Sequence, residues 1–129
     1  MTGKIIPVAA LMCDDIRHEM GGGHSIIGVA QPTLVCPAFP SRRRAAFAII
    51  ANLKEGDDAK LVVTLKWQGE EKWSEERLYT IEGDELGSML PISGTIAGFD
   101  EPGTLSLEVT TDDGTRTLQE WLIEGADPS

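Results

Sequence analysis

The chain is acidic: its 129 residues include 21 aspartates and glutamates against 11 lysines and arginines, which makes a formal net charge of -10 at pH 7. Hydrophobic residues make up 41% of the composition, which excludes a disordered chain and predicts one domain over residues 1–129 with its own core. Because the average surface repels phosphates and anionic lipid headgroups, we expect neither a nucleic acid nor a membrane as a partner.

Two apolar segments near the amino terminus enclose a polar, glycine-rich connector. Residues 5–13 are apolar throughout and contain Pro7, so they predict a largely buried strand that begins near a sheet edge. Residues 25–36 predict the next strand, which Pro32 bends or interrupts. The connector is therefore expected to join two strands that pair as a hairpin.

The two cysteines of the chain are predicted to be free, buried thiols. In a hairpin that closes near Cys13 and Ser25, Cys36 lies well beyond the roughly 7 Å between Cα atoms that a disulfide allows. The sequence also lacks a segment long enough to cross a membrane as a helix, since no stretch approaches the required length of about 20 apolar residues. The short apolar run before Cys13 does not match a lipoprotein signal, because Met12 occupies the small-residue position. These features predict a cytoplasmic protein.

The middle of the chain predicts the most deeply buried strand. Residues 37–40, Pro-Ala-Phe-Pro, are a rigid extended link that we expect to cross between sheets. Residues 45–53 are apolar on both alternating faces, which predicts a central strand or a contribution to a homodimer interface. The basic run at 42–44 lacks neighbouring aromatic residues and is interpreted as a solvated entry into this strand.

The carboxyl-terminal half predicts two further hairpins. Residues 61–67 alternate between apolar and polar, and a turn at 68–70 returns the chain into 73–81. Of the three tryptophans, Trp73 is the one expected at the surface, because the other two share the phase of core residues.

Beyond this hairpin, residues 82–90 predict a loop with one short helical turn, and residues 92–99 resume extended structure. A turn at 112–114 leads into residues 115–123, whose change of phase between Leu118 and Trp121 predicts a β-bulge.

These segments amount to about eight strands, with turn signals every 8–12 residues or so and no helical pattern of about ten residues. The expected fold is all-β: a single-domain antiparallel β-sandwich of the immunoglobulin-like or Greek-key type. Residues 126–129 are expected to fray at its end.

The connector also carries a resemblance to a known family. Cys-Asp-Asp-Ile-Arg at 13–17, then Glu19, a glycine run and Ser-Ile-Ile-Gly-Val at 25–29, resembles a family of small bacterial and phage-associated β-sandwich proteins of unknown function. The family would have a lysine where this chain has Gly23 and an aromatic residue where it has Ala30. The resemblance implies the fold and no activity.

The connector gathers the candidate functional residues. They are Asp14, Asp15, Arg17, His18, Glu19 and His24. A divalent metal held by the two aspartates and the two histidines, with Glu19 as the general base, would make a metal-dependent hydrolase.

A structural role for these residues is favoured, because their spacing matches no established metal-binding motif. We expect a carboxylate of Asp14 or Asp15 to accept backbone N–H bonds, and Arg17 to pair with Asp15 or Glu19. The glycines at 21–23 then let the chain reverse. We expect no metal and no other cofactor.

The leading functional prediction is a non-enzymatic binding or assembly module that acts through its surface, as a homodimer or with a protein partner. It follows from the lack of a catalytic constellation and from the two apolar faces of residues 45–53. The metal-dependent hydrolase is the first alternative. The second is an acidic mimic of nucleic acid that occupies the groove of a basic partner, which requires carboxylates gathered on one face.

Overall fold

The computed structural model describes residues 1–126 and, among these, all side chains except those of residues 93–97. Within this range the chain forms ten β-strands, and no helix there is long and apolar enough to cross a membrane. The strands are β1 (Lys4–Cys13), β2 (Asp15–His18), β3 (His24–Ile27), β4 (Thr33–Cys36), β5 (Ser41–Lys54), β6 (Gly56–Trp67), β7 (Glu70–Ile81), β8 (Glu85–Phe99), β9 (Gly103–Thr111) and β10 (Gly114–Gly125).

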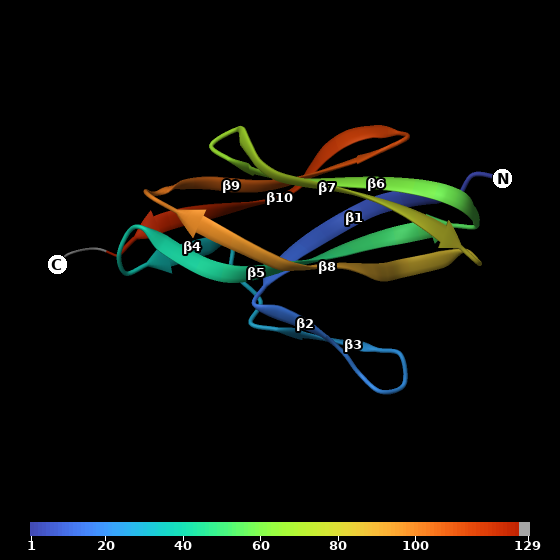
Figure 1. Ribbon diagram of the computed structural model, residues 1–129, viewed down its shortest axis with the longest axis horizontal. Helices are drawn as coiled ribbons and strands as arrows, with labels where there is room; N and C mark the ends of the chain where they lie inside the picture. Colours follow the sequence, from blue (N-terminus) through green and yellow to red (C-terminus); the bar gives the residue numbers. More distant parts are fainter. Residues whose placement is uncertain (127–129) are drawn as a thin grey trace.

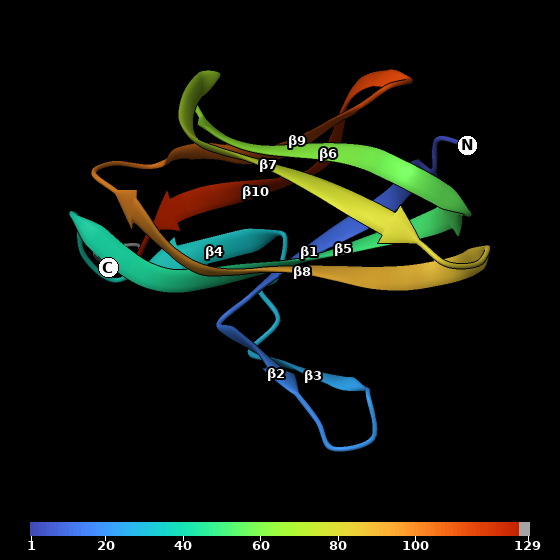
Figure 2. The same ribbon diagram turned by 45° about the vertical axis from the view of Figure 1, so that its right-hand side comes forward.

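The strands form two larger sheets and one separate hairpin. The three-stranded sheet has the order β1-β5-β8, and the five-stranded sheet has the order β4-β10-β9-β6-β7. Strands β2 and β3 pair with each other. Figures 1 and 2 show the two sheets as stacked layers, with hairpin β2–β3 on the outer side of the three-stranded sheet.

The prediction of an all-β fold with mainly antiparallel strands is confirmed. The chain is all-β, and its strand pairings are antiparallel apart from the parallel pairing of β10 with β4. The expected number of about eight strands is too low for the described range, which contains ten. The additional strands come from the amino-terminal segment.

One hydrophobic core lies between the two sheets. It includes Phe47 and Ile49 from β5, Leu61 from β6 and Trp121 from β10. The rings of Trp121 and Phe47 come from opposite sheets, and their centroids lie 5.9 Å apart with an interplanar angle of 52°. Full burial of a large apolar side chain contributes about 1.5–3 kcal/mol, so this core decides which face of each strand points inward.

The amino-terminal segment differs from the prediction. Residues 25–36 are not one strand, because residues 28–32 separate β3 from β4, which belongs to the five-stranded sheet. The connector forms its own hairpin instead of joining two paired strands. Gly21 and Gly22 make this possible, since their φ angles of 102° and 93° reverse the chain in a conformation that favours glycine.

The two cysteines are free and buried, as expected, but for a different reason. Cys13 ends β1 in the three-stranded sheet, whereas Cys36 ends β4 in the five-stranded sheet. The assumed hairpin between these segments does not form.

The predicted fraying of residues 126–129 is wrong for Ala126, which donates a hydrogen bond to the carbonyl of Cys36 at 3.0 Å. The other residues of the predicted frayed end, 127–129, lie outside the described range.

Other predictions for the rest of the chain agree with the structure. β5 is the central strand of its sheet, and residues 37–40 cross between the two sheets, as expected. A register shift in β10 lies between Thr117 and Gln119, close to the predicted bulge.

The predicted loop at 82–90 is wrong from Glu85 onward, because β8 begins there and pairs with Leu53 of β5. The surface position expected for Trp73 is also wrong. Trp73 is half-buried and packs against the core, because it pairs with Leu65, whose side chain points inward.

Arg77 links the two sheets along the edge where β7 and β8 lie. Its Nε and Nη2 each lie 3.0 Å from Oε2 of Glu75, and Nη1 donates to the carbonyl oxygen of Pro91 at 3.0 Å. β7 is the edge strand of one sheet and β8 of the other. The hydrogen bond to Pro91 therefore ties neighbouring edges of the two layers together, while the two contacts with Glu75, on the same strand, hold the guanidinium in position.

We expect Arg77→Met to lower the free energy of unfolding by about 1–2 kcal/mol, because it keeps the apolar stem but leaves Glu75 and the Pro91 carbonyl without their donor. Lys60→Met is the matched control, since Lys60 lies 3.5 Å from Glu76 in an exposed ion pair and should contribute under about 0.5 kcal/mol. Urea denaturation measures both losses. Equal losses would contradict a special role for the Arg77 contacts.

Candidate functional site

Hairpin β2–β3 and its turn at residues 19–23 form an arm that projects from the stacked sheets (Figure 2). Its paired positions run from Asp15 opposite Ile27 at the base to His18 opposite His24 near the tip. The turn residues are exposed to solvent. The arm is therefore a surface feature that contributes little to the main core.

The base of the arm is held by contacts of Asp14. Its backbone N–H donates to the carbonyl of Ile27 at 2.9 Å, and its carboxylate accepts a hydrogen bond of 2.6 Å from Arg43 on β5. Gly28 has a φ of 70°, and a Cβ at this position would lie 2.3 Å from Oδ2 of Asp14. The close approach of Asp14 therefore requires glycine at position 28.

The other candidate residues of the connector have local partners. Asp15 accepts a 2.9 Å hydrogen bond from the backbone N–H of the next residue and lies 3.6 Å from Nε of Arg17. Glu19 accepts a 2.7 Å hydrogen bond from a serine hydroxyl on β3. The expected carboxylate–backbone bond and the local pairing of Arg17 are confirmed. The contact of Asp14 with Arg43 was not predicted.

The four candidate ligands of the alternative metal site, Asp14, Asp15, His18 and His24, do not converge. Asp15 and His18 are three positions apart on β2, a distance of about 10 Å along a strand. Among the described residues, no group of three or more His, Cys, Asp or Glu side chains is arranged to hold a metal. The aspartates lie at the base of the arm and the histidines toward its tip, so the geometry does not support the proposed hydrolase centre.

The two histidines do meet across the arm. The ring centroids of His18 and His24 lie 4.3 Å apart, with the rings tilted by 53°. Nε2 of His24 is buried and has no hydrogen-bond partner within the described part of the chain. Two imidazoles supply half of a tetrahedral zinc shell, so this pair is more simply a tilted cross-strand contact that stiffens the arm.

The thiol of Cys13 is poorly placed to act as a nucleophile. Its side chain is fully buried, and Sγ lies 3.5 Å from the carbonyl oxygen of Ala46, to which it donates. Burial, and secondarily the negative charge of Asp14, raises the pKa of the Cys13 thiol above its ordinary value. Because the thiolate is the nucleophilic form, a raised pKa opposes nucleophilic catalysis by Cys13.

The outward side of the three-stranded sheet carries a set of apolar side chains, which we name the apolar outer face. Its residues are Ile6, Ala9 and Leu11 on β1, Ala46, Ala48 and Ile50 on β5, and Met89 and Pro91 on β8. Leu11, Ala48 and Pro91 form one row across all three strands. Ala46 and Ala48 are buried yet do not belong to the main core, because they point to the opposite side of the sheet.

The outward side of the five-stranded sheet is mixed, because Leu78 and Leu122 are 64% and 44% exposed there among polar cross-strand pairs. Lys66 lies 3.0 Å from Glu108, and the hydroxyls of Thr110 and Thr115 lie 2.8 Å apart. These contacts are cross-strand pairs between charged or hydroxyl side chains, which suit a surface that faces water. The two outward sides thus differ in charge, because ion pairs lie among the apolar side chains of the five-stranded sheet.

Only the β5 part of the apolar outer face was predicted from the sequence. On β1 the register shifts between Pro7 and Ala9, which breaks the simple alternation of the strand. On β8 the segment was assigned to a loop. The signal that identifies the whole face is the pairing of β5 with both neighbours, which requires the tertiary structure.

We expect Gly28→Ala to lower the free energy of unfolding by about 1–3 kcal/mol, because alanine is strained at positive φ and its Cβ displaces the Asp14 carboxylate from Arg43. Gly23→Ala is the matched control within the same arm. No atom lies within 4 Å of a Cβ built at Gly23, so the change should stay under about 0.5 kcal/mol. Denaturant melts that show equal stability for the two variants would contradict the contact at Asp14.

Comparison of the chain with models of protein families and with curated proteins found no match.

Proposed function

We propose that this protein is a non-enzymatic assembly module whose apolar outer face binds a second copy of the chain. The observation that carries the proposal is the set of apolar side chains that runs across β1, β5 and β8 on the apolar outer face without a charged residue between them. Leu11 and Ile6 are 38% and 37% exposed, so apolar area remains to be buried there. Contiguous exposed patches of a few hundred Å² are typical of interaction sites.

The distribution of charge favours a second copy as the partner. Lys4 lies on the outward side at one end of the apolar outer face, where Lys54 is 3.8 Å from Asp84, and Arg42 and Arg44 lie at the other end. The net charge of the chain is -10, so two copies repel each other least where basic side chains flank the contact. The same patch on both copies then makes a closed two-fold dimer.

The apolar outer face alone is about half the size of a standard interface, so the proposed dimer requires the arm as additional contact surface. Three strands about 4.8 Å apart and about nine residues long at about 3.3 Å per residue span about 400 Å². A standard interface buries about 800 Å² on each partner. The arm projects on the same side as the apolar outer face (Figures 1 and 2), so it is placed to add contact area in a face-to-face pair.

The proposal includes a finer description of the fold as an immunoglobulin-like β-sandwich. The order β1-β5-β8 beside β10-β9-β6-β7 corresponds to strands A, B and E beside G, F, C and C′ of variable-type domains. The edge strand β4, which follows β1 and hairpin β2–β3 in the chain, joins the second sheet by parallel pairing with β10. This order supports the Greek-key description, and with it the proposed resemblance to the β-sandwich family.

Light scattering of the purified protein tests the dimer. At tens of micromolar we expect a mass of about twice the 13.9 kDa of one chain, since burial of a standard interface supports association at such concentrations. A mass near 13.9 kDa over that range would contradict the proposal.

Neither alternative function has comparable support. The hydrolase lacks convergent ligands, and Lys60 and Lys66 each pair with a glutamate on the outward side of the five-stranded sheet, which dilutes the negative charge that a nucleic-acid mimic needs. We further infer a cytoplasmic location, supported by two cysteines that lie on different sheets and form no disulfide.

A further inference from the structure

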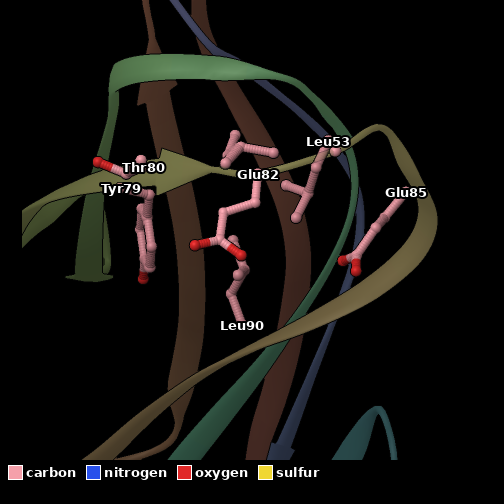
Figure 3. Close-up of a pocket in the computed structure, with 8 residues that line it drawn as sticks. Leu53, Tyr79, Thr80, Glu82, Glu85 and Leu90 are labelled. Atoms are coloured by element: carbon pink, nitrogen blue, oxygen red, sulfur yellow. The ribbon is translucent and has the colours of Figure 1, made fainter.

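A cavity of about 280 Å³ lies where β7 ends and β8 begins (Figure 3). Leu53, Ile81 and Leu90 form its apolar floor and belong to the main core. Ligand pockets usually hold about 300–1,000 Å³, so this one is near the lower limit. It suits a single long side chain or a short alkyl chain.

The polar lining of this cavity is acidic. Among the described residues that line it, two are glutamates, Glu82 and Glu85, and none is lysine, arginine or histidine. Glu85 accepts a 2.5 Å hydrogen bond from the hydroxyl of Ser88, whereas Glu82 forms no ion pair with another described residue. Figure 3 shows the side chains of Tyr79, Glu82 and Glu85 extending toward the same side.

Tyr79 provides an independent indication of a missing partner. Its hydroxyl oxygen is buried and has no hydrogen-bond partner among the residues that the structure describes. A buried hydroxyl usually has a partner, and its absence costs free energy that a ligand with a donor recovers. The hydroxyl, the two carboxylates and the apolar floor together define a site for a ligand with one cationic end.

We propose that this cavity binds an ammonium or guanidinium group on an aliphatic stem. The stem covers the apolar floor, while the cation donates hydrogen bonds to Glu82 and lies beside the ring and hydroxyl of Tyr79. A free alkylamine and the lysine or arginine side chain of another protein share this chemistry. The cavity lies between β7 and β8, away from the apolar outer face, so the proposal does not depend on the dimer.

The test is a titration of the ¹⁵N-labelled protein at low salt, followed by amide chemical shifts. The probes are n-butylamine and the neutral n-butanol, which has the same stem. We expect butylamine to shift amides of residues 79–90 saturably and butanol to bind at least about tenfold more weakly, because only the amine carries a charge. Equal affinities for the two probes would overturn the proposal.

Three variants locate the interaction. Glu82→Gln should weaken butylamine binding by about fivefold and Tyr79→Phe by about twofold, since each removes one partner of the cation. Glu71→Gln removes an exposed carboxylate at the opposite end of β7 and should leave binding unchanged. Unaltered amide spectra away from the cavity verify that the variants fold. Equal binding by Glu82→Gln and Glu71→Gln would rule out this site.

A peptide distinguishes the two sources of the cation. If acetyl-Gly-Lys-Gly-amide binds about tenfold more tightly than butylamine, and the norleucine analogue does not bind, the cation belongs to a protein side chain. If the lysine peptide binds with the same affinity as butylamine, the cavity is assigned to a free amine. Both results support a cation site, and failure of the peptide and of butylamine together overturns it.

Discussion

Leu11→Asp should convert the proposed dimer into a monomer. Leu11 lies on the edge strand of the three-stranded sheet, is 38% exposed and forms a row with Ala48 and Pro91 across the apolar outer face. A carboxylate there loses its water when two faces meet and has no cation in the row to pair with. We expect the dissociation constant to rise by at least about 100-fold, since an unpaired buried charge costs several kcal/mol. Sedimentation equilibrium measures this change.

Leu78→Asp is the matched control for this prediction. Leu78 is 64% exposed on β7 of the five-stranded sheet, so the same substitution adds a carboxylate far from the apolar outer face. This variant should remain a dimer. Dissociation of both variants, or of neither, would show that the apolar outer face is not the contact surface.

Trp121→Ala should cause the largest loss of stability that we predict. Trp121 is 2% exposed, and its ring faces Phe47 of the opposite sheet. Replacing a buried tryptophan with alanine removes its transfer free energy and leaves a cavity between two sheets that cannot close. We expect the free energy of unfolding to fall by about 3–5 kcal/mol, as measured by guanidinium denaturation.

Leu122→Ala provides the control on the same strand. Leu122 is 44% exposed and points to the other side of β10, so its truncation should cost under about 1 kcal/mol. A loss below about 1 kcal/mol for Trp121→Ala would contradict a packed core between the two sheets. The pair of variants therefore tests the stacking of the sheets separately from the stability of β10 itself.

The arm affects the proposed dimer but not the proposed cation site. It is anchored through Asp14 and Arg43, and Arg43 lies on β5, the strand that forms the centre of the apolar outer face. A change at Gly28 therefore acts on the position of the arm and on the end of that face together. The cation site lies between the ends of β7 and β8, so the same change should leave amine binding unaffected.

Alternation of apolar and polar residues was sufficient to place most long strands. In residues 61–67 every second side chain points inward, and burial of one face is worth enough to make this pattern strict, whereas residues 45–53 were placed by an apolar run on both faces. The turn at Gln68 and Gly69 was also predicted, because glycine readily accepts the conformation that a tight turn requires. In the structure both residues adopt positive φ angles, 52° and 81°. These features depend on neighbours in the sequence, so the sequence alone determined them.

The amino-terminal segment was harder to predict, because its strands β2, β3 and β4 have four residues each. Two alternations do not distinguish one bent strand from two short ones. The pairing of β4 with β10 joins residues far apart in the chain, and no local pattern encodes such a contact. The sequence therefore showed extended structure in this segment, whereas tertiary pairing decided how it was divided.

In the candidate sites, too, local contacts could be predicted from the sequence, whereas contacts between strands could not. The local contacts of Asp15 and Arg17 were foreseeable, since they lie two residues apart on one strand. The contact of Asp14 with Arg43 spans 29 positions and depends on how β1 pairs with β5. The apolar outer face and the acidic cavity likewise combine side chains from several strands. Alternation tells which side of a strand is apolar, but only the assembled sheets decide which neighbours lie beside it and whether another layer covers it.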